Sequence, residues 1–187
     1  MNMLLRLSHD FHDMLNGMSH ERHTQAAADA IRSVRGAVVT ISDTRTLESD
    51  SSGERIATLL NVRGHVVAAR RIIPDVADEI VATLNELVKN LSPQVIITTG
   101  GTGFSKRDVT TQAIRTLLDA ELHGFGELFR SLSYEAVGPA AMLSGAIAGR
   151  VGDVFLFALP GSEHAVQLGM EKLILPTLQH LVWERAR

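Results

Sequence analysis

A run of threonines and glycines, Thr99-Gly100-Gly101-Thr102-Gly103, is the segment of this sequence best suited to hold an anion. Glycine has no Cβ, so the backbone N–H groups of such a loop can approach a phosphate, and a helix after the loop adds the favourable end of its dipole. A tight strand-to-helix turn would need the same glycines for backbone geometry alone. The segment lacks the Gly-Lys-Ser/Thr ending of a P-loop and the spacing of a dinucleotide-binding fingerprint. From these residues alone, a phosphate site and a structural turn are equally good interpretations.

Two aspartates, Asp75 and Asp108, could together hold a hard cation, because carboxylate oxygens suit Mg²⁺ and Mg²⁺ commonly links protein carboxylates to phosphate oxygens. Each also precedes a predicted helix, where an aspartate can cap free backbone N–H groups and stabilise the helix by about 1 kcal/mol. For either aspartate taken alone, capping is the simpler interpretation. Lys106 and Arg107 lie beside the glycine run and could neutralise phosphate charge, or could be solvated in a surface loop. The clustering of these residues favours a site.

Other residue types that carry chemistry give weaker indications. The pairs His9/His12 and His20/His23 have a spacing that permits metal binding on a helix, but no third ligand is evident. The chain has no cysteine, which excludes disulfides and thiolate chemistry, and a protein that needs no disulfide suits a reducing cytoplasm. No Ser/His/Asp arrangement is present either, so the sequence predicts no protein nucleophile.

A strand buried on both faces is predicted at residues 37–41, where a short β-branched run occurs, and further strands alternate with helices predicted from apolar residues at helical spacing. The predicted strands cover residues 37–41, 65–73 and 94–99, and the predicted helices cover residues 56–63, 77–91, 110–118 and 125–134. This alternation predicts a three-layer α/β/α fold, in which a mostly parallel sheet lies between two layers of helices.

The C-terminal part departs from that alternation. Two further strands are predicted at residues 142–148 and 154–159, and their connector could close a hairpin that makes one of them antiparallel. Met142, Phe155 and Phe157 are interpreted as core side chains. A closing helix is predicted after Gly161, with an interruption near Pro176 because proline removes a helical hydrogen bond.

Ligands of open α/β sheets bind outside the carboxyl ends of the strands, so the residues that follow each strand are the site candidates. They include the glycine run and the two aspartates already named. Further polar or turn-forming candidates follow the first and last strands: Ser42, Asp43, Asp50, Ser52, Pro160, Gly161 and Ser162. All of them are expected to meet at one edge of the sheet.

The length of 187 residues and the apolar content of 45% predict one domain at residues 36–187, preceded by an extension at residues 1–35 that is partly helical or mobile. Apolar residues recur at helical spacing between Met3 and Leu15, which suits a short amphipathic helix that docks on the body or on another subunit. The net charge of −3 argues against nucleic acid as a partner. No apolar stretch reaches the roughly 18 residues of a membrane span, so no membrane partner is expected and the cytoplasm is the expected location.

Six blocks in order along the chain resemble the MoaB/Mog family of molybdenum cofactor biosynthesis. They are Ser42-Asp43, Asp50-Ser51-Ser52-Gly53, Ile73-Pro74-Asp75, Thr98 to Gly103 with Arg107-Asp108-Val109-Thr110, Gly124-Phe125-Gly126-Glu127 and Leu159-Pro160-Gly161-Ser162. The resemblance spans about residues 36–180, and six ordered blocks are far more specific than any one of them. The segment from Phe125 to Glu135 is more similar to the MoaB branch.

The resemblance implies a molybdopterin-binding fold that assembles as a homotrimer or homohexamer, with other molybdenum cofactor biosynthesis proteins as further candidate partners. Active members of the family transfer AMP from Mg²⁺-ATP to the terminal phosphate of molybdopterin and release pyrophosphate. Carried onto this chain, Asp75 would be catalytic and bind the metal, Asp108 would be catalytic at the molybdopterin end, and residues 99–103 would cradle the pterin phosphate. The nucleotide region would be lined by Ser42, Asp43, Asp50, Ser52, Pro160, Gly161 and Ser162.

One departure from the family pattern leaves a second function open. After Asp108-Val109-Thr110 the family commonly continues with proline and an acidic residue, whereas this chain has Thr111-Gln112. A MoaB-type protein that binds molybdopterin without transferring AMP is therefore the main alternative. A CinA-like enzyme that acts on nicotinamide nucleotides is a weaker alternative. Members of that group have a motif similar to Gly-Asp-Glu after the first strand and one similar to Gly-Gly-Leu-Gly-Pro at the loop, and this chain lacks both.

Overall fold

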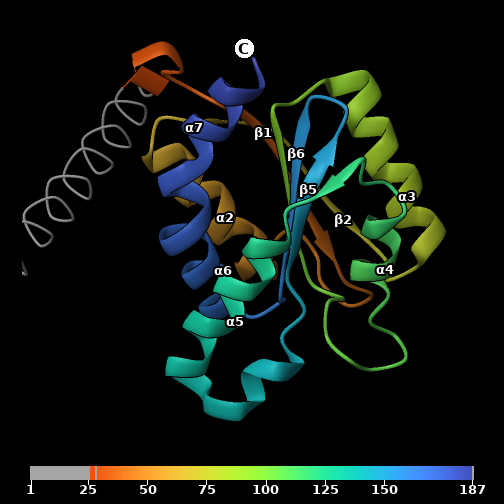
Figure 1. Ribbon diagram of the computed structural model, residues 1–187. Helices are drawn as coiled ribbons and strands as arrows, with labels where there is room; N and C mark the ends of the chain where they lie inside the picture. Colours follow the sequence, from red (N-terminus) through yellow and green to blue (C-terminus); the bar gives the residue numbers. More distant parts are fainter. Residues whose placement is uncertain (1–25, 28, 187) are drawn as a thin grey trace, which may run out of the picture.

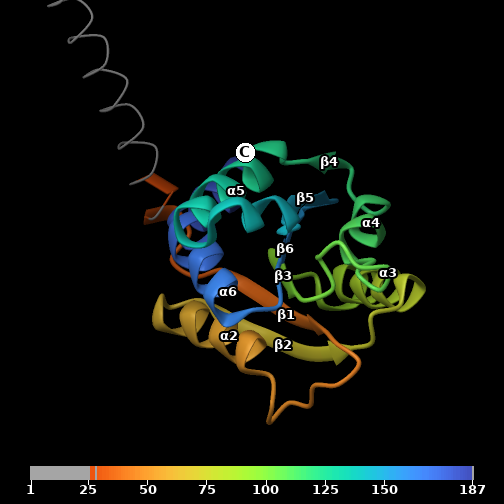
Figure 2. The ribbon, with the colours of Figure 1, turned by 90° about the horizontal axis from the view of Figure 1, so that it is seen from below.

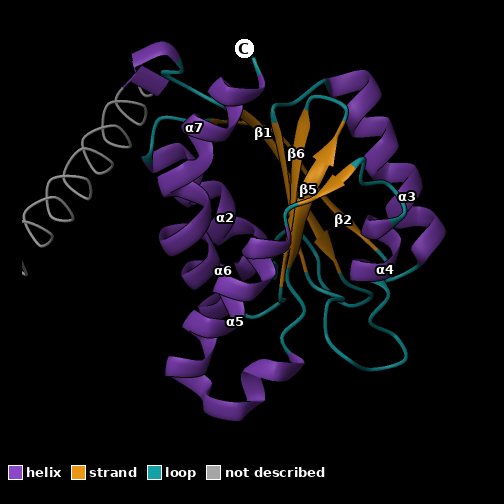
Figure 3. Ribbon diagram, in the orientation of Figure 1, coloured by secondary structure: helices purple, strands orange, loops and turns teal. Residues whose placement is uncertain are grey.

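A sheet between two layers of helices forms the body of the protein, as the computed structural model shows for residues 26–27 and 29–186 (Figure 1). Helices α2, α5, α6 and α7 cover one face of the sheet, and α3 and α4 cover the other (Figure 3). The predicted three-layer α/β/α architecture is therefore confirmed. The amphipathic segment between Met3 and Leu15 and the two histidine pairs lie outside the described residues.

The sheet has six strands in the order β2-β1-β3-β6-β5-β4. Their bounds are β1 Arg35–Ile41, β2 Val66–Ile73, β3 Val95–Thr99, β4 Ala120–Glu121, β5 Ile147–Val151 and β6 Val154–Leu159. The first four strands in the sheet order are parallel, whereas β5 runs antiparallel to both β6 and β4. This confirms the mostly parallel sheet and the antiparallel hairpin predicted after residue 142.

The helices occupy the predicted places with small changes at their ends. Their bounds are α2 Ser51–Val62, α3 Ala77–Glu86, α4 Thr110–Arg115, α5 His123–Val137, α6 Glu163–Gly169 and α7 Leu175–Arg185. Residues Leu87–Leu91 extend α3 as a π-helical turn, and Met170–Ile174 join α6 to α7 in the same way. The predicted interruption near Pro176 is thus a π-helical turn just before it, and Pro176 lies in the first turn of α7, where its missing N–H is least costly.

Both faces of the central strands are buried, which explains why their sequences show continuous apolar runs and no alternation. In β1, Val38 contributes to the core on the α2 and α7 side, while Ala37 and Val39 contribute to the core on the α3 and α4 side. In β3, Val95 and Ile97 face the first core and Ile96 faces the second. The sheet therefore holds the carboxyl ends of its strands in fixed positions.

The segment before β5 differs from the prediction. Residues Gly138–Leu143 form a 3₁₀-helical turn, and β5 begins only at Ile147. The predicted strand at 142–148 is wrong at its start, and so is the core assignment of Met142, whose side chain is 78% exposed. Phe157 is buried as predicted. The two-residue strand β4 was not predicted, because it is too short to show a period.

Candidate functional site

The loops that follow β1, β2, β3 and β6 meet at the carboxyl edge of the parallel strands, seen from below in Figure 2. The register pairs Ile41 with Ile73 and pairs Thr99 with both Thr40 and Leu159. The strands therefore end level with one another, and the polar residues that follow each strand lie at the same edge of the sheet, as predicted.

The glycine loop approaches other backbone segments so closely that its first two glycines cannot be replaced without strain. Gly100 has φ +100°, and a Cβ there would lie 2.2 Å from the Ile41 carbonyl oxygen. Gly101 has φ +61°, and a Cβ there would lie 2.3 Å from Thr110 Oγ1 and 2.7 Å from Asp75 Oδ2. The structural interpretation of the glycine run is therefore correct for these two positions. Gly101 also places the loop directly against Asp75.

The backbone and side-chain donors of the loop are only partly free. The Gly100 N–H donates to the Leu159 carbonyl at 3.1 Å, and Thr99 Oγ1 donates to the Pro160 carbonyl at 3.0 Å. Thr102 Oγ1 and Thr110 Oγ1 are buried without a hydrogen-bond partner. Any anion held by this loop would therefore meet its later part, from Gly101 onward, while its first residues fix the loop to β6.

Asp75 carries the most unusual carboxylate of the edge. Its Oδ1 is buried without a hydrogen-bond partner, although its backbone N–H donates to Asp43 Oδ1 at 3.1 Å. Burial, above all, raises the pKa of Asp75, and the neighbouring carboxylates of Asp108 and Asp43 add to that rise. An underpaired carboxylate beside two others is unfavourable for folding and suits a ligand that brings positive charge.

Neither Asp75 nor Asp108 caps the helix that follows it. The N-cap residues of α3 and α4 are Val76 and Val109, and neither helix has a side-chain capping bond. Asp108 instead accepts a hydrogen bond from the Ser105 N–H at 2.8 Å within its own loop. The capping interpretation of both aspartates is therefore wrong, and their role as site residues stays a prediction.

Asp108 differs from Asp75 in its electrostatics. Hydrogen bonding to Ser105, above all, and to the backbone of Gly103 holds the pKa of Asp108 below its ordinary value. An ion pair lies in the same region, where Arg107 Nη2 donates to Asp43 Oδ2 at 2.9 Å. The edge thus combines an Asp108 whose pKa is lowered, an Asp43–Arg107 ion pair and an Asp75 whose pKa is raised.

The lowered pKa of Asp108 makes its contribution to stability depend on pH. A group with a lowered folded pKa stabilises the fold above its unfolded pKa, and this contribution is lost as the pH falls through the folded pKa. We expect Asp108→Asn to lower the melting temperature slightly at pH 7, and by a smaller amount at pH 3. Thermal melts at both pH values check this prediction. An equal difference in melting temperature between variant and parent at the two pH values would contradict it.

Three other candidate residues form hydrogen bonds that cap helices or connect loops. Asp50 caps α2 by accepting from the Gly53 N–H at 2.9 Å, and Ser162 caps α6 by accepting from the Ala165 N–H at 3.2 Å. Ser52 Oγ donates to the Gly161 carbonyl at 2.8 Å, which ties the start of α2 to the loop after β6. Asp50 and Ser52 are buried.

A pocket of about 590 Å³ lies beside these loops, between the segment after β1 and the edge strand β2. Of the predicted nucleotide residues, only Ser42 and Asp43 line it; its other polar lining residues are Arg45, Thr46, Arg70 and Arg71. Sequence reasoning missed these arginines, because Arg45 lies in a polar loop and Arg70 and Arg71 lie inside the predicted strand at 65–73, where their spacing does not indicate a site. Asp50, Ser52 and residues 160–162 are not among the residues that line this pocket.

The comparisons with known proteins show the family of this chain. Residues 37–180 match the family model described as "Probable molybdopterin binding domain". Molybdenum cofactor biosynthesis protein B of Bacillus cereus is 46% identical over 165 residues, which cover 88% of this chain and 98% of the relative. This chain belongs to the MoaB/Mog family.

Solved structures of the family share the fold. A crystal structure of a molybdenum cofactor biosynthesis protein B is 47% identical with a TM-score of 0.81, covering 83% of this chain and 97% of the other. The tungsten cofactor synthesizing protein MoaB from Pyrococcus furiosus is 36% identical with a TM-score of 0.75, covering 84% of this chain and 99% of the other. The family match includes every candidate site residue from Ser42 to Ser162.

Proposed function

We propose that this MoaB/Mog family member acts in molybdenum cofactor biosynthesis, where it binds molybdopterin and transfers AMP from Mg²⁺-ATP to its terminal phosphate. The observation that carries the proposal is the Asp75 carboxylate, which lies against Gly101 with one oxygen buried and unpartnered. A carboxylate held in this state gains most from a cation that arrives with a substrate. Its relatives' names, which refer to molybdenum and tungsten cofactor synthesis, support the pathway.

The residues present fit a magnesium ion that comes with the nucleotide. Among the described residues, no group of three or more His, Cys, Asp or Glu side chains is placed to hold a metal ion. Mg²⁺ is commonly held by one or two carboxylates together with substrate phosphates and water, so Asp75 with Asp108 or Asp43 is a sufficient protein contribution. When bound there, the ion would offset the negative charge of the phosphates.

The proposed reaction needs charge compensation and alignment, without a protein nucleophile. A terminal phosphate oxygen of molybdopterin attacks the α-phosphorus of ATP, a new P–O bond forms, and the bond to pyrophosphate breaks. Asp108 would orient the molybdopterin end, while the later part of the glycine loop would face its phosphate. Arg45 lines the neighbouring pocket, where its guanidinium suits the anionic end of a nucleotide.

The direct test incubates the full chain with molybdopterin, ATP and Mg²⁺ and analyses the product by mass spectrometry. The proposal expects adenylylated molybdopterin and an equal amount of pyrophosphate, both absent when Mg²⁺ is omitted. Binding of molybdopterin is measured in parallel. If neither binding nor transfer occurs, the proposed function is wrong.

A non-catalytic molybdopterin-binding role is the second candidate, and one observation favours it. The first turn of α4, which begins at Thr110, contains no acidic residue, because Thr111-Gln112 stand where the family commonly has proline and an acidic residue. The site therefore has less negative charge available near Asp108 for binding a cation. Tight molybdopterin binding without any transfer would select this role.

Self-association into a homotrimer or homohexamer is expected of the intact protein. Exposed apolar side chains gather on α5 and the 3₁₀ turn after it, among them Leu128, Tyr134, Met142 and Leu143. Monomers rarely leave such residues clustered at the surface without a partner. Light scattering at micromolar concentration should give about three or six times the chain mass of 20.3 kDa. We expect Met142→Lys combined with Leu143→Lys to lower that mass, whereas a monomeric parent would contradict the prediction.

A further inference from the structure

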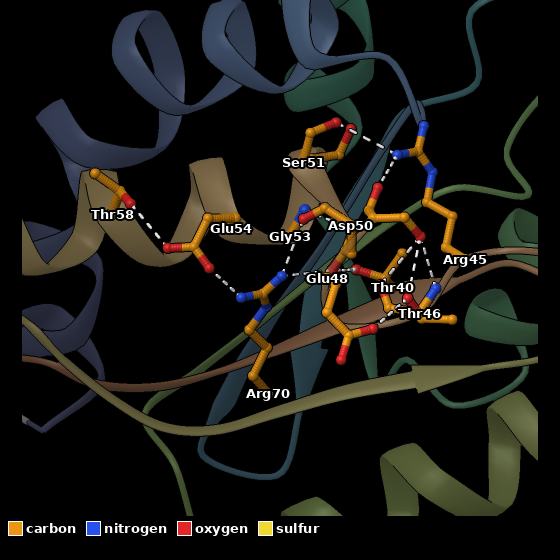
Figure 4. Close-up of polar contacts among 12 residues, drawn as sticks. Thr40, Arg45, Thr46, Glu48, Asp50, Ser51, Gly53, Glu54, Thr58 and Arg70 are labelled. Carbon is orange, nitrogen blue, oxygen red and sulfur yellow. Dashed lines mark hydrogen bonds and ion pairs between the residues drawn. The ribbon is translucent and has the colours of Figure 1, made fainter.

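Arg70, on the edge strand β2, spans the first turn of α2 (Figure 4). Its Nη2 donates both to Asp50 Oδ2 at 3.0 Å and to the Asp50 backbone carbonyl at 2.9 Å. Its Nη1 pairs with Glu54, one turn further along the helix. A single guanidinium thus holds the residue that caps α2 and the helix behind it.

The Asp50 carboxylate that receives Arg70 is fully buried and bound from several sides. Thr40 Oγ1 donates to its Oδ2 at 2.8 Å from β1, and the Gly53 N–H donates to its Oδ1 at 2.9 Å from α2. The Asp50 side chain has no exposed surface. Because removing the charged partner of a buried carboxylate is strongly destabilising, Arg70 helps to hold this group in place together with Thr40 and Gly53.

The network leaves no free space around the start of α2. A Cβ at Gly53 would lie 2.1 Å from Asp50 Oδ2 and 2.5 Å from Thr40 Oγ1. Polar contacts of fixed geometry therefore set the position of the first turn of α2 against β1. These contacts add to the apolar packing between α2 and β1, which by itself would tolerate small shifts.

The first turn of α2 in turn positions the loops of the candidate site. Ser52 Oγ reaches the Gly161 carbonyl at 2.8 Å, and a Cβ at Gly161 would lie 3.3 Å from Gly100 Cα, so these loops are stacked on one another. On the other side, Arg45 Nη1 donates to Ser51 Oγ at 3.3 Å, which ties the loop after β1 to the same turn. A shift of this turn would therefore move the loops after three different strands.

We propose that Arg70 is a positioning residue of the site: through Asp50 and the first turn of α2 it sets the relative places of residues 42–50, 100–103 and 160–162. The role requires a guanidinium, because one planar fork must reach a carboxylate, a carbonyl and Glu54 together, which a single ammonium cannot do. The proposal concerns how the site is prepared and goes beyond the proposed function. Only its ligand-binding test rests on that function.

Hydrogen exchange of the unliganded full chain tests the proposal with Arg70→Lys. We expect exchange to become about tenfold faster at Gly53 and Glu54 and also at Gly100, whose N–H donates to Leu159, while the amides inside β3 keep their protection. The matched control is Arg115→Lys, which alters another arginine–carboxylate pair, with Glu121, at the far end of α4. This control should leave all these amides unchanged.

The outcomes separate positioning from a local structural role. Faster exchange confined to residues 50–54, with Gly100 unchanged, would overturn the proposal and leave Arg70 as a helix partner only. If Arg70→Lys does not fold, Thr40→Val, which removes one donor to the same carboxylate, replaces it, and unchanged Gly100 exchange there would also overturn the proposal.

Ligand binding provides a second readout. Molybdopterin and ATP affinities of Arg70→Lys are expected to fall about tenfold while the protein stays folded. Unchanged affinities in a variant of a binding-competent parent would overturn the positioning role. A parent that binds neither compound would refute the proposed function instead, and the exchange experiment would still decide the role of Arg70.

Discussion

Gly100→Ala is expected to lower the free energy of unfolding by about 2–5 kcal/mol, because it combines a left-handed backbone conformation with a steric overlap. Gly100 has φ +100°, and an added Cβ would lie 2.2 Å from the carbonyl oxygen of Ile41, which is backbone and cannot rotate away. Either β1 or the glycine loop must shift. Chemical denaturation of the variant beside the parent measures the loss.

Gly64→Ala provides the matched control for this substitution. Gly64 also has a positive φ of +78°, but a Cβ there would meet nothing within 4 Å. Its expected cost is therefore the conformational part alone, about 1–2 kcal/mol. Equal losses in the two variants would show that the approach of Gly100 to Ile41 relaxes at no cost, against the prediction.

The glycines of the loop differ in what they approach. Gly100 is needed for the close approach to β1, whereas Gly101 and Gly103 face the two aspartates: a Cβ would lie 2.7 Å from Asp75 Oδ2 at Gly101 and 2.7 Å from Asp108 Oδ2 at Gly103. The structural interpretation of the glycine run is thus confirmed at Gly100 and Gly101, whereas the phosphate interpretation stays a prediction. Substitutions at Gly101 would displace Asp75 as well as obstruct a ligand, so they cannot separate binding from folding.

The order of strands and helices could be predicted because each central strand is buried on both faces and each helix has one apolar face. Val38 and Val39 point into different cores, so β1 could only appear as a continuous apolar run. The start of β5 could not be predicted in this way. Met142 and Leu143 are apolar residues that lie exposed on a 3₁₀ turn. Hydrophobicity alone does not distinguish such a surface-exposed pair from the start of a buried strand.

The meeting of the candidate site residues followed from topology, but their individual roles did not. Parallel strands that end level bring Ser42, Asp75 and Gly100 to one edge of the sheet, and this follows from the backbone register alone. Which aspartate caps a helix depends on backbone geometry that spacing does not determine: Asp50 caps α2, whereas Asp75 and Asp108 cap nothing. The partnership of Asp50 with Arg70 joins a loop to a strand and has no signal in the sequence.

Asp75→Asn is expected to raise or preserve the melting temperature at pH 7, although it removes a residue of the site. The folded protein raises the pKa of Asp75, chiefly by burial, so the contribution of this group to stability is fully present below its unfolded pKa and is lost as the pH rises through the folded pKa. Asparagine has no charge to bury. Its advantage over aspartate should therefore be largest near pH 7 and disappear near pH 3, as thermal melts at the two pH values would show.

The same Asp75→Asn variant should lose nearly all AMP transfer while it keeps most of its molybdopterin binding. Asparagine preserves the shape of the side chain, but it lacks the charge that a magnesium ion carried by ATP requires. The matched control is Asp78→Asn, an exposed position in the first turn of α3, which should retain transfer and lose a little stability because it removes negative charge from a helix N-terminus. Transfer and molybdopterin binding are measured for parent and both variants. Unaltered transfer in Asp75→Asn would refute the metal-binding role of Asp75, whereas a parent that binds molybdopterin without transferring AMP would establish the non-catalytic function.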